Sequence, residues 1–340
     1  MRAARLHPDA DRLRLDEVAV PEPSGDGVLV RITATGVCQS DLHIIDGELD
    51  SVVMRPVTPG HEIAGRVAAT GHDVDDLATD EPVAVMVGWG CGHCRWCVSG
   101  HEQLCPDGHT AGATTDGGFA EYVLVPHRRN VVPLGDIDPL DATPLGCAAL
   151  SSYAAIKRAR DHIAGGSLVV VIGAGGLGQY AVQFARTMTG AAVAVVEPRA
   201  IARERALACG ADHAVAPGPE AAVELHGLSN GAGAAAVIDL VGSDETLTLA
   251  AEVVGTRGIV TVLGVAGGSL PFSFGLMARE ASIATVYAGT VADLQEVVAM
   301  AQVQRFSTLI ETYPLEEINA ALDDLRAGSI LGRAVVTPGA

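Results

Sequence analysis

The strongest constraint on the fold is the pattern of residues 149–287, where wholly apolar strands alternate with helical segments. Continuous apolar runs occur at 168–175, 191–197, 234–242 and 258–265. Helical patterns follow the first two runs, at 179–190 and 201–211. A strand that is apolar at every position is buried on both faces, and helical crossovers between such strands produce a parallel sheet. We therefore expect a doubly wound α/β domain here.

The flanking segments have a different pattern. Residues 1–148 contain short β-like runs, such as VLVRITATGV and EIAGRVAATG, separated by Gly, Pro and Asp clusters, which is typical of antiparallel β structure. Residues 288–340 add two helical patterns and a strand, GRAVVTP. Because domains usually hold about 100–200 residues, a chain of 340 residues is expected to form two of them.

The composition excludes several classes of protein. Apolar residues make up 49% and charged residues 19% of the chain, which fits a folded globular protein and not a disordered one. The net charge of −19, with scattered basic residues, disfavours nucleic acid as a partner. The sequence has no run of about 18 apolar residues and no signal-like N-terminus, so we expect a cytoplasmic protein without membrane association.

Four of the seven cysteines lie in one short stretch. Cys91, Cys94, Cys97 and Cys105 follow the spacing Cys-x2-Cys-x2-Cys-x7-Cys. In a reducing compartment such clustering points to a metal, and four thiolates can surround zinc and leave no open position. The stretch therefore predicts a structural zinc site. An iron–sulfur cluster also uses closely spaced cysteines and stays open as an alternative.

A glycine motif follows the first apolar run. Gly173, Gly175 and Gly178 form the pattern G-x-G-x-x-G, directly before a helical segment. Backbone amides at such a helix start can hold the pyrophosphate of a dinucleotide. Glu197, 19 residues after Gly178, ends the next strand and can accept hydrogen bonds from the adenosine ribose, which favours NAD. Arg199 could partner a 2′-phosphate, so NADP is disfavoured but stays open.

A third group consists of Cys38 in GVCQSDLH and His61 in PGHEIAGRV. A thiolate and an imidazole are both good zinc ligands. Either residue alone would more often be ordinary, since a lone cysteine usually packs as a small apolar group. Their occurrence together with a four-cysteine stretch and a dinucleotide motif favours a second metal site.

With these motifs, the chain resembles the medium-chain zinc-dependent alcohol dehydrogenases over essentially its full length. The matching segments are GVCQSDLH, PGHEIAGRV, the cysteine stretch, GCAALSSYAAI and VIGAGGLGQYAVQFA. The resemblance implies a GroES-like catalytic domain split in sequence around a Rossmann domain. Residues 1–148 and 288–340 would then fold together, and residues 149–287 would bind the dinucleotide. It also implies an enzyme that interconverts an alcohol and its ketone or aldehyde by hydride transfer with NAD.

The resemblance further implies a catalytic zinc, so that two zinc ions per chain are expected. Its ligands would be Cys38, His61 and Cys147. Glu62 would lie behind the metal as a supporting carboxylate or transient ligand. Asp41 would orient His61 by accepting the N–H of its other ring nitrogen.

A proton relay is implied as well. It would run from the alcohol through Ser40 and the nicotinamide ribose to His43 and solvent. Gln39 stands where many relatives carry a cation near the pyrophosphate, so cofactor contact there is expected to be weaker. Cys209 belongs to neither metal set and is expected to pack in the interior.

The cofactor contacts implied by the resemblance are Gly173, Gly175, Gly176, Leu177, Gly178, Glu197, Arg199, Leu263, Val265 and Arg333, the last one at the pyrophosphate. The implied substrate pocket comprises Met54, Val87, Trp89, Phe119 and Ala288. Val87 and Ala288 are small where relatives often carry aromatic side chains, which favours a secondary or bulky alcohol. The resemblance also implies a homo-oligomer, a tetramer in preference to a dimer.

Three alternatives remain. A polyol or biosynthetic-intermediate dehydrogenase of the same family would share every motif above. A zinc-free quinone or enoyl reductase would lack the cysteine stretch and the other zinc ligands, which this chain retains. A non-enzymatic dinucleotide-binding protein would have no need of Ser40 and His43. Metal analysis and an NADH absorbance assay over a panel of alcohols distinguish these alternatives.

Overall fold

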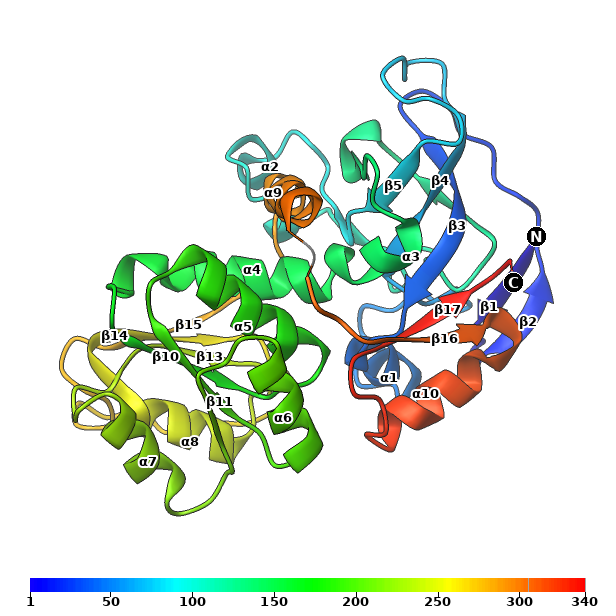
Figure 1. Ribbon diagram of the computed structural model, residues 1–340. Helices are drawn as coiled ribbons and strands as arrows, with labels where there is room; N and C mark the ends of the chain where they lie inside the picture. Colours follow the sequence, from blue (N-terminus) through cyan, green and yellow to red (C-terminus); the bar gives the residue numbers. More distant parts are fainter. Residues whose placement is uncertain (305, 340) are drawn as a thin grey trace. The chain divides into compact units, whose positions relative to one another are not determined.

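The computed structural model of the protein describes residues 1–304 and 306–339 (Figure 1). These residues form two compact units. Unit 1 comprises Met1–Leu150, Thr290–Arg305 and Leu309–Ala340, and unit 2 comprises Ser151–Gly289 and Phe306–Thr308. The chain passes from unit 1 to unit 2 after residue 150 and returns after residue 289, in each case two residues after the expected domain boundaries at 148 and 287. Residues 306–308, which were expected in the C-terminal part of the catalytic domain, belong to unit 2.

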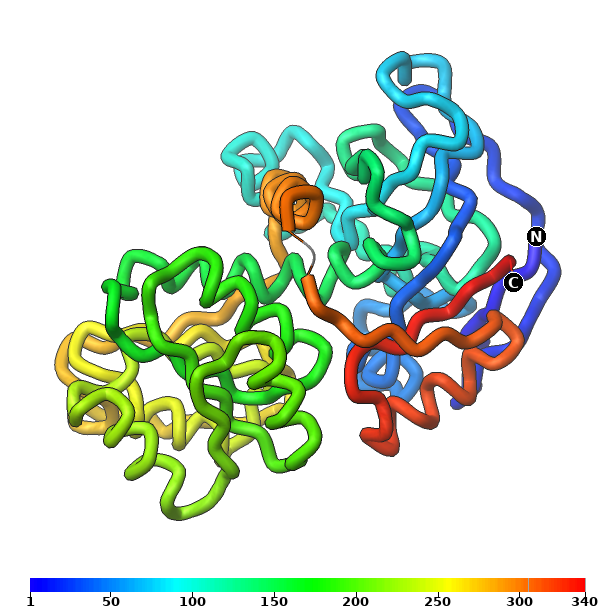
Figure 2. The backbone as a smooth tube through the Cα atoms, viewed as in Figure 1, coloured from blue at the N-terminus to red at the C-terminus, as the bar shows by residue number. Residues whose placement is uncertain are grey.

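Unit 1 is built on a seven-stranded sheet in the order β16-β17-β3-β4-β5-β9, with β8 paired to β3. Its strands are β3 (Val28–Gly36), β4 (Glu62–Thr70), β5 (Pro82–Val85), β8 (Tyr122–Val125), β9 (Val131–Pro133), β16 (Ile310–Pro314) and β17 (Arg333–Thr337). The pairing is antiparallel except between β16 and β17. Because β17 pairs with β3, the C-terminal segment completes the sheet begun by the N-terminal one, as the tube in Figure 2 shows.

Apolar side chains alternate along the strands of this sheet. Val28, Val30 and Ile32 of β3 are buried and pack with Ile63 and Val67 of β4. The period of two places these side chains on one face of the sheet, as the sequence pattern predicts. This packing gives unit 1 a rigid base for the segments that follow β3 and precede β4.

The other elements of unit 1 are short strands and helices. The strands are β1 (Arg2–Arg5), β2 (Arg14–Glu17), β6 (Gly88–Trp89) and β7 (His109–Thr110). The α-helices are α1 (Gln39–Ile45), α2 (Arg95–Val98), α3 (Pro139–Ala142), α9 (Val291–Val303) and α10 (Ile318–Arg326). The 3₁₀ turns are η1 (Glu102–Leu104), η2 (Arg128–Asn130), η3 (Thr143–Gly146) and η5 (Leu315–Glu317).

Unit 2 contains a six-stranded parallel sheet in the order β12-β11-β10-β13-β14-β15. Its strands are β10 (Leu168–Ile172), β11 (Ala192–Val196), β12 (His213–Val215), β13 (Ala234–Asp239), β14 (Val254–Val262) and β15 (Ser282–Thr285). Its helical elements are α4 (Ala148–Ala159, in this unit from Ser151), η4 (Arg160–His162), α5 (Gly176–Met188), α6 (Ala200–Ala208), α7 (Ala221–Leu228) and α8 (Asp244–Val253).

The central strand β10 shows why these runs are apolar throughout. Leu168 and Val170 pack in a cluster with residues of α7 and α8. Val169 and Val171, which point to the opposite face of the sheet, are also fully buried. Both faces are therefore covered, as predicted for a doubly wound fold.

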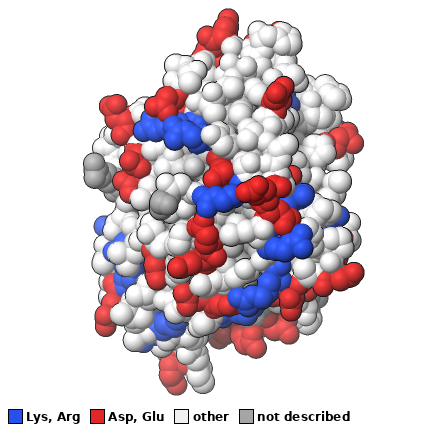
Figure 3. All heavy atoms as spheres, turned by 90° about the vertical axis from the view of Figure 1, so that its right-hand side faces the viewer, with Lys and Arg blue, Asp and Glu red and all other residues white. Residues whose placement is uncertain are grey.

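Two further features bear on possible partners. Within residues 1–304 and 306–339, no helix is long and apolar enough to cross a membrane. On the face drawn in Figure 3, basic side chains are interspersed with acidic ones, so this face has no continuous basic surface.

Candidate active site

The first predicted zinc ligand caps helix α1. Cys38 precedes the helix, and its backbone N–H donates to Asp41 Oδ2 at 2.8 Å. The carboxylate in the first turn thereby satisfies an amide that would otherwise lack a partner. Ser40 and His43 are half-buried and three residues apart, which places them on one face of the helix.

His61 approaches from the turn before β4. Gly60 has a φ of +92°, a conformation that favours glycine, and its N–H lies 3.3 Å from Asp41 Oδ1. His61 Nδ1 lies 3.4 Å from the same oxygen. Because Asp41 occupies the Nδ1 side of the ring, Nε2 is the nitrogen left for a metal.

Cys147 comes from the turn between η3 and α4. The sulfurs of Cys38 and Cys147 and a ring nitrogen of His61 lie within 4.8 Å of one another. The Cys147 thiol donates a hydrogen bond to the Cys38 sulfur. This bond lowers the pKa of Cys38 well below its ordinary value, although burial opposes ionisation. The same bond raises the pKa of Cys147. The thiolate is the form that binds metal. Two sulfurs and one nitrogen with a fourth position open fit a catalytic zinc.

Behind this donor set lies the fully buried Glu62, and it is held by Arg333. Arg333 Nε donates to Glu62 Oε2 at 3.0 Å, and Arg333 Nη2 donates to Oε1. Oε1 also accepts from the N–H of Ala148, next to Cys147, at 3.0 Å. A Cβ at Gly36 would lie only 1.9 Å from Oε2, so this position requires glycine. The structure thus pairs Arg333, which the family resemblance places at the pyrophosphate, with Glu62.

The four clustered cysteines form a second donor set. All four sulfurs lie within 4.8 Å of one another, and those of Cys94 and Cys97 are 3.6 Å apart. The N–H of Cys91 donates to the Cys105 sulfur at 3.3 Å. Hydrogen bonds from the backbone of His93 and Cys94 lower the pKa of Cys91 to about 6, whereas burial raises that of Cys97 to about 12. Four converging sulfurs fit a structural zinc with no open position.

Unit 2 carries the glycine motif at the carboxyl end of β10. Gly173 has a φ of +97°, and a Cβ on Gly178 would lie 2.0 Å from the Gly173 carbonyl oxygen, so both positions need glycine. A Cβ at Gly175 would meet nothing within 4 Å, which leaves space for a ligand. Gly176 and Leu177 begin α5, where free backbone amides suit a pyrophosphate.

Glu197 follows β11 and binds the glycine turn. Its Oε2 accepts from the N–H of Ala174 at 2.8 Å, and its Oε1 accepts from Arg199 Nε at 2.9 Å. Burial would raise the pKa of Glu197, but these bonds hold it below its ordinary value. A cavity of about 860 Å³ lies beside the carboxylate, lined by residues that include Gly173 and Val241. Arg199, the predicted partner of a 2′-phosphate, is therefore engaged with an ionised Glu197.

Leu263 and Val265 lie in the turn after β14. The N–H of Leu263 donates to the Asp239 carbonyl at 2.8 Å. Val265 is exposed and lines a second cavity, of about 540 Å³, together with Gly242. Both cavities of unit 2 lie at the carboxyl ends of parallel strands, where ligands bind in folds of this kind. The predicted cofactor residues of unit 2 are thus gathered at this edge of its sheet, whereas Arg333 lies in unit 1.

The predicted relay residues have defined contacts. Ser40 Oγ lies 3.9 Å from Cys38 Sγ. His43 Nδ1 lies 2.6 Å from Glu48 Oε2. Glu48 was not predicted as a site residue, since the sequence shows only that it is acidic and stands five positions after His43. Gln39 is exposed at the start of α1.

Two residues assigned to the substrate pocket are buried. Phe119 is fully buried, and a Cβ on Gly60 would touch its ring. Trp89 is 4% exposed, packs in the sheet core and donates from Nε1 to the Met86 carbonyl. Met54 is exposed, and Val87 is 8% exposed.

Comparison with known proteins decides the family. Residues 24–136 match the alcohol dehydrogenase GroES-like domain family, and residues 176–303 match the zinc-binding dehydrogenase family. An NAD-dependent alcohol dehydrogenase of Sulfurisphaera tokodaii is 35% identical, over 99% of this chain and 100% of the relative. The chain belongs to the medium-chain zinc-dependent alcohol dehydrogenases. The expected fold class and the expected NAD-dependent oxidoreductase activity on alcohols are thereby confirmed.

Solved structures agree with this alcohol dehydrogenase family. The alcohol dehydrogenase of the archaeon Aeropyrum pernix has a TM-score of 0.92 and 32% identity, covering 99% of this chain and 100% of the other. A D-arabinose 1-dehydrogenase (NADP(+)) of Saccharolobus solfataricus is 32% identical in sequence over 99% of this chain and 97% of its own length. Family membership therefore leaves the substrate within the family to be determined.

Proposed function

We propose that this dehydrogenase holds two zinc ions per chain and oxidises a secondary or bulky alcohol, or reduces the corresponding carbonyl compound. The observation that carries the catalytic part is the convergence of Cys38, His61 and Cys147 on one point. Three protein ligands are the number that a catalytic zinc has when its fourth position is kept for substrate. When bound there, zinc supplies a Lewis acid that lowers the pKa of an alcohol, and NAD supplies the hydride acceptor. The small side chain of Val87 supports a spacious substrate pocket.

Other residues of unit 1 orient the zinc ligands and transfer the proton. Asp41 holds the His61 ring so that Nε2 can bind metal. Glu62, which is fixed by Arg333, accepts a hydrogen bond from the N–H of Ala148 and so stabilises the turn that carries Cys147. In the relay, Ser40 would accept the proton of the alcohol and His43 would deliver it to solvent, and NAD, when bound, would supply the ribose hydroxyl that links the two.

The relay is tested by His43→Ala. We expect slower alcohol oxidation, most of all at low pH, where the alcohol is harder to ionise. Exogenous imidazole should restore part of the rate by supplying a substitute base. General acid–base groups contribute about 10²–10⁴-fold, and a residue at the solvent end of a relay should lie at or below the lower figure. The measurement is the pH profile of kcat with and without imidazole, at unchanged metal content.

A packing role for His43 makes different predictions. If His43 only lines the substrate pocket beside Leu42 and Ile44, the variant changes KM and substrate preference. Its pH profile then matches that of the wild type, and imidazole has no effect. That outcome would remove His43 from the mechanism.

A polyol or biosynthetic intermediate is the second candidate substrate class. The D-arabinose 1-dehydrogenase among the relatives supports it, because a sugar is a polyhydroxylated substrate. Activity over primary, secondary, cyclic and polyol substrates distinguishes the two. Secondary or cyclic alcohols with the highest kcat/KM support the first proposal, and a preference for polyols overturns it.

The preference for NAD over NADP rests on Glu197. Glu197→Gln should raise the ratio of kcat/KM for NADP to that for NAD about fivefold or more. Two unit charges about 4 Å apart repel by about 1 kcal/mol even in bulk water, and more near a protein surface. The amide oxygen can still accept from the N–H of Ala174, so the glycine turn is preserved.

The matched control for this measurement is Glu245→Gln. Glu245 is exposed and lines the same cavity, but its carboxylate accepts from Ser243 Oγ, whereas that of Glu197 accepts from the N–H of Ala174 in the glycine turn. Glu245→Gln should change the ratio of kcat/KM for NADP to that for NAD less than Glu197→Gln does. A wild-type enzyme that favours NADP would contradict the assignment and would point to Arg199.

We also propose a cytoplasmic homo-oligomer, a tetramer in preference to a dimer. The two proposed zinc sites need their six cysteines as thiolates, which supports a reducing compartment. Strand β15 lies at the edge of the unit 2 sheet, and large apolar side chains nearby are exposed: Phe272, Phe274, Ile283 and Tyr287. Such edges and apolar patches are usually covered by a partner. Light scattering of the purified protein tests the number of subunits.

A further inference from the structure

A carboxylate meets His43 just beyond the end of α1. The chain turns back after Ile45, and the N–H of Glu48 donates to the His43 carbonyl at 3.0 Å. This turn brings Glu48 Oε2 to 2.6 Å from His43 Nδ1. The His43 side chain is 16% exposed and that of Glu48 is 58% exposed, so a largely buried ring meets a carboxylate that reaches solvent.

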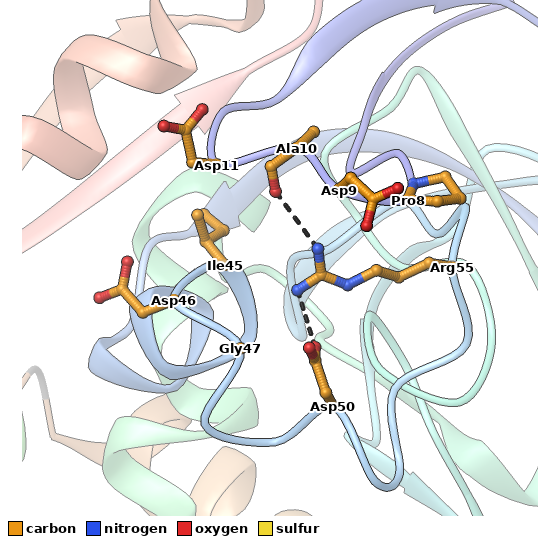
Figure 4. A pocket seen from close by; sticks show the side chains of 9 residues that line it. All are labelled: Pro8, Asp9, Ala10, Asp11, Ile45, Asp46, Gly47, Asp50 and Arg55. Atoms are coloured by element: carbon orange, nitrogen blue, oxygen red, sulfur yellow. Dashed lines mark hydrogen bonds and ion pairs between the residues drawn. The ribbon is translucent and has the colours of Figure 1, made fainter.

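The segment that carries Glu48 is fixed by Arg55. Arg55 Nη2 donates to the Ile44 carbonyl at 3.0 Å and to Asp50 Oδ1 at 2.8 Å. Its Nη1 donates to the Ala10 carbonyl at 3.2 Å. Figure 4 shows the guanidinium between Ala10 and Asp50, with Asp46 and Gly47 on the same loop. Arg55 thus holds the segment through the Ile44 carbonyl before Glu48 and through the Asp50 carboxylate after it.

The neighbouring acidic residues are engaged elsewhere. Asp46 pairs with Arg326 at 2.6 Å, and Asp50 pairs with Arg55. Glu48 is therefore the carboxylate of this loop that contacts the His43 ring within the described residues.

An ionised carboxylate only accepts hydrogen bonds, so its contact with Nδ1 requires the proton of a neutral imidazole to be on Nδ1. Nε2 then carries the lone pair, as a base needs. We propose that Glu48 is a positioning residue that fixes His43 in this tautomer and so prepares Nε2 to take the proton of the relay. The proposal rests on the proposed relay function of His43. In this role Glu48 orients the histidine base through a hydrogen bond to its other ring nitrogen, as a third group does beside a catalytic base.

The tautomer can be observed without turnover. We would record long-range ¹H–¹⁵N NMR spectra of the full-length, metal-loaded protein with labelled histidine, and assign the His43 ring from its loss in His43→Gln. The wild type should show protonated Nδ1 and unprotonated Nε2 in the neutral ring. Glu48→Leu should yield a mixture of tautomers. Glu48→Gln should keep the wild-type tautomer, because its amide oxygen can accept the same hydrogen bond.

Kinetics supply the second readout. Glu48→Leu should lower kcat for alcohol oxidation about tenfold, comparable to the lower end of the loss when a metal-binding histidine loses its hydrogen-bonded partner, with KM for the alcohol unchanged. Glu48→Gln should stay close to the wild type. The charge control is Asp11→Asn, which removes one negative charge from the rim of the neighbouring acidic pocket (Figure 4) and should change neither readout.

The outcomes separate this proposal from the relay itself. If Glu48→Leu leaves both the tautomer and kcat unchanged while His43→Ala slows oxidation, the relay stands and the role of Glu48 is wrong. If His43→Ala leaves the pH profile unchanged, the relay is wrong, and the spectra still show whether Glu48 sets the tautomer. In a His43→Ala background, Glu48→Leu should not lower kcat for alcohol oxidation any further. A further decrease in kcat would mean that Glu48 acts independently of His43.

Discussion

Cys38→Ala should lower kcat by about 10³-fold or more and reduce the zinc content from two to one per chain. The variant removes a thiolate from the open donor set formed with His61 and Cys147. A catalytic metal contributes several kcal/mol of charge stabilisation, and each 1.36 kcal/mol corresponds to about tenfold in rate. Metal analysis and steady-state kinetics on the same preparation provide the check.

Cys94→Ala should also remove one zinc, but with a different consequence. Cys94 belongs to the closed set of four sulfurs, so its loss should lower the melting temperature or impair assembly. Cys209→Ala is the matched control, because Cys209 is buried outside both sets and should keep both metals. Wild-type protein that binds one zinc or none under metal-replete conditions would contradict the two-site proposal.

The parallel sheet of unit 2 could be predicted because its signal is local. Each central strand is apolar on both faces, as Val169 and Val170 of β10 show, and short apolar runs separated by helical patterns are typical of a covered parallel sheet. The start of α5 was less predictable. The helical pattern suggests Gln179, but the helix begins at Gly176, since the glycines that suit a pyrophosphate also form its first turn.

The four-cysteine set was predictable for a similar reason, because its members lie in one short stretch. The set of Cys38, His61 and Cys147 came from the family resemblance, and the surroundings of both sets did not follow from the sequence. Cys38 and Asp41 are three residues apart, and their contact follows from helix capping. Arg333 and Glu62 are 271 residues apart, and no periodicity in the sequence links them. Phe119 illustrates the same limit: its burial depends on packing beneath the Gly60 turn, which sequence spacing does not report.

Arg333→Met should lower the free energy of unfolding by about 3–5 kcal/mol, because breaking a buried ion pair leaves one charge uncompensated. The side chains of Arg333 and Glu62 are 6% and 0% exposed, so water cannot replace the lost partner. Burial already raises the pKa of Glu62, and the Arg333 charge is what opposes that rise. Urea denaturation of the metal-loaded protein measures the change.

The matched control is Arg12→Met, which breaks the exposed pair with Asp323 and should have little effect. Glu62→Gln alone should also destabilise the protein, since it leaves Arg333 buried without its counter-charge. The double variant Glu62→Gln/Arg333→Met should lose less stability than the sum of the two single variants, because no unpaired charge remains. Additive losses would show that the two side chains stabilise unit 1 independently.

Arg333→Met also tests whether Arg333 contacts the pyrophosphate of NAD. A residue that contacts the cofactor directly should raise KM for NAD when it is replaced, even where the protein remains folded. A residue that acts only through Glu62 should leave KM for NAD unchanged and should lower zinc retention, because Glu62 braces the Cys147 turn through the N–H of Ala148. The structure pairs Arg333 with Glu62 through two hydrogen bonds, so we expect the loss of zinc retention to be the larger effect.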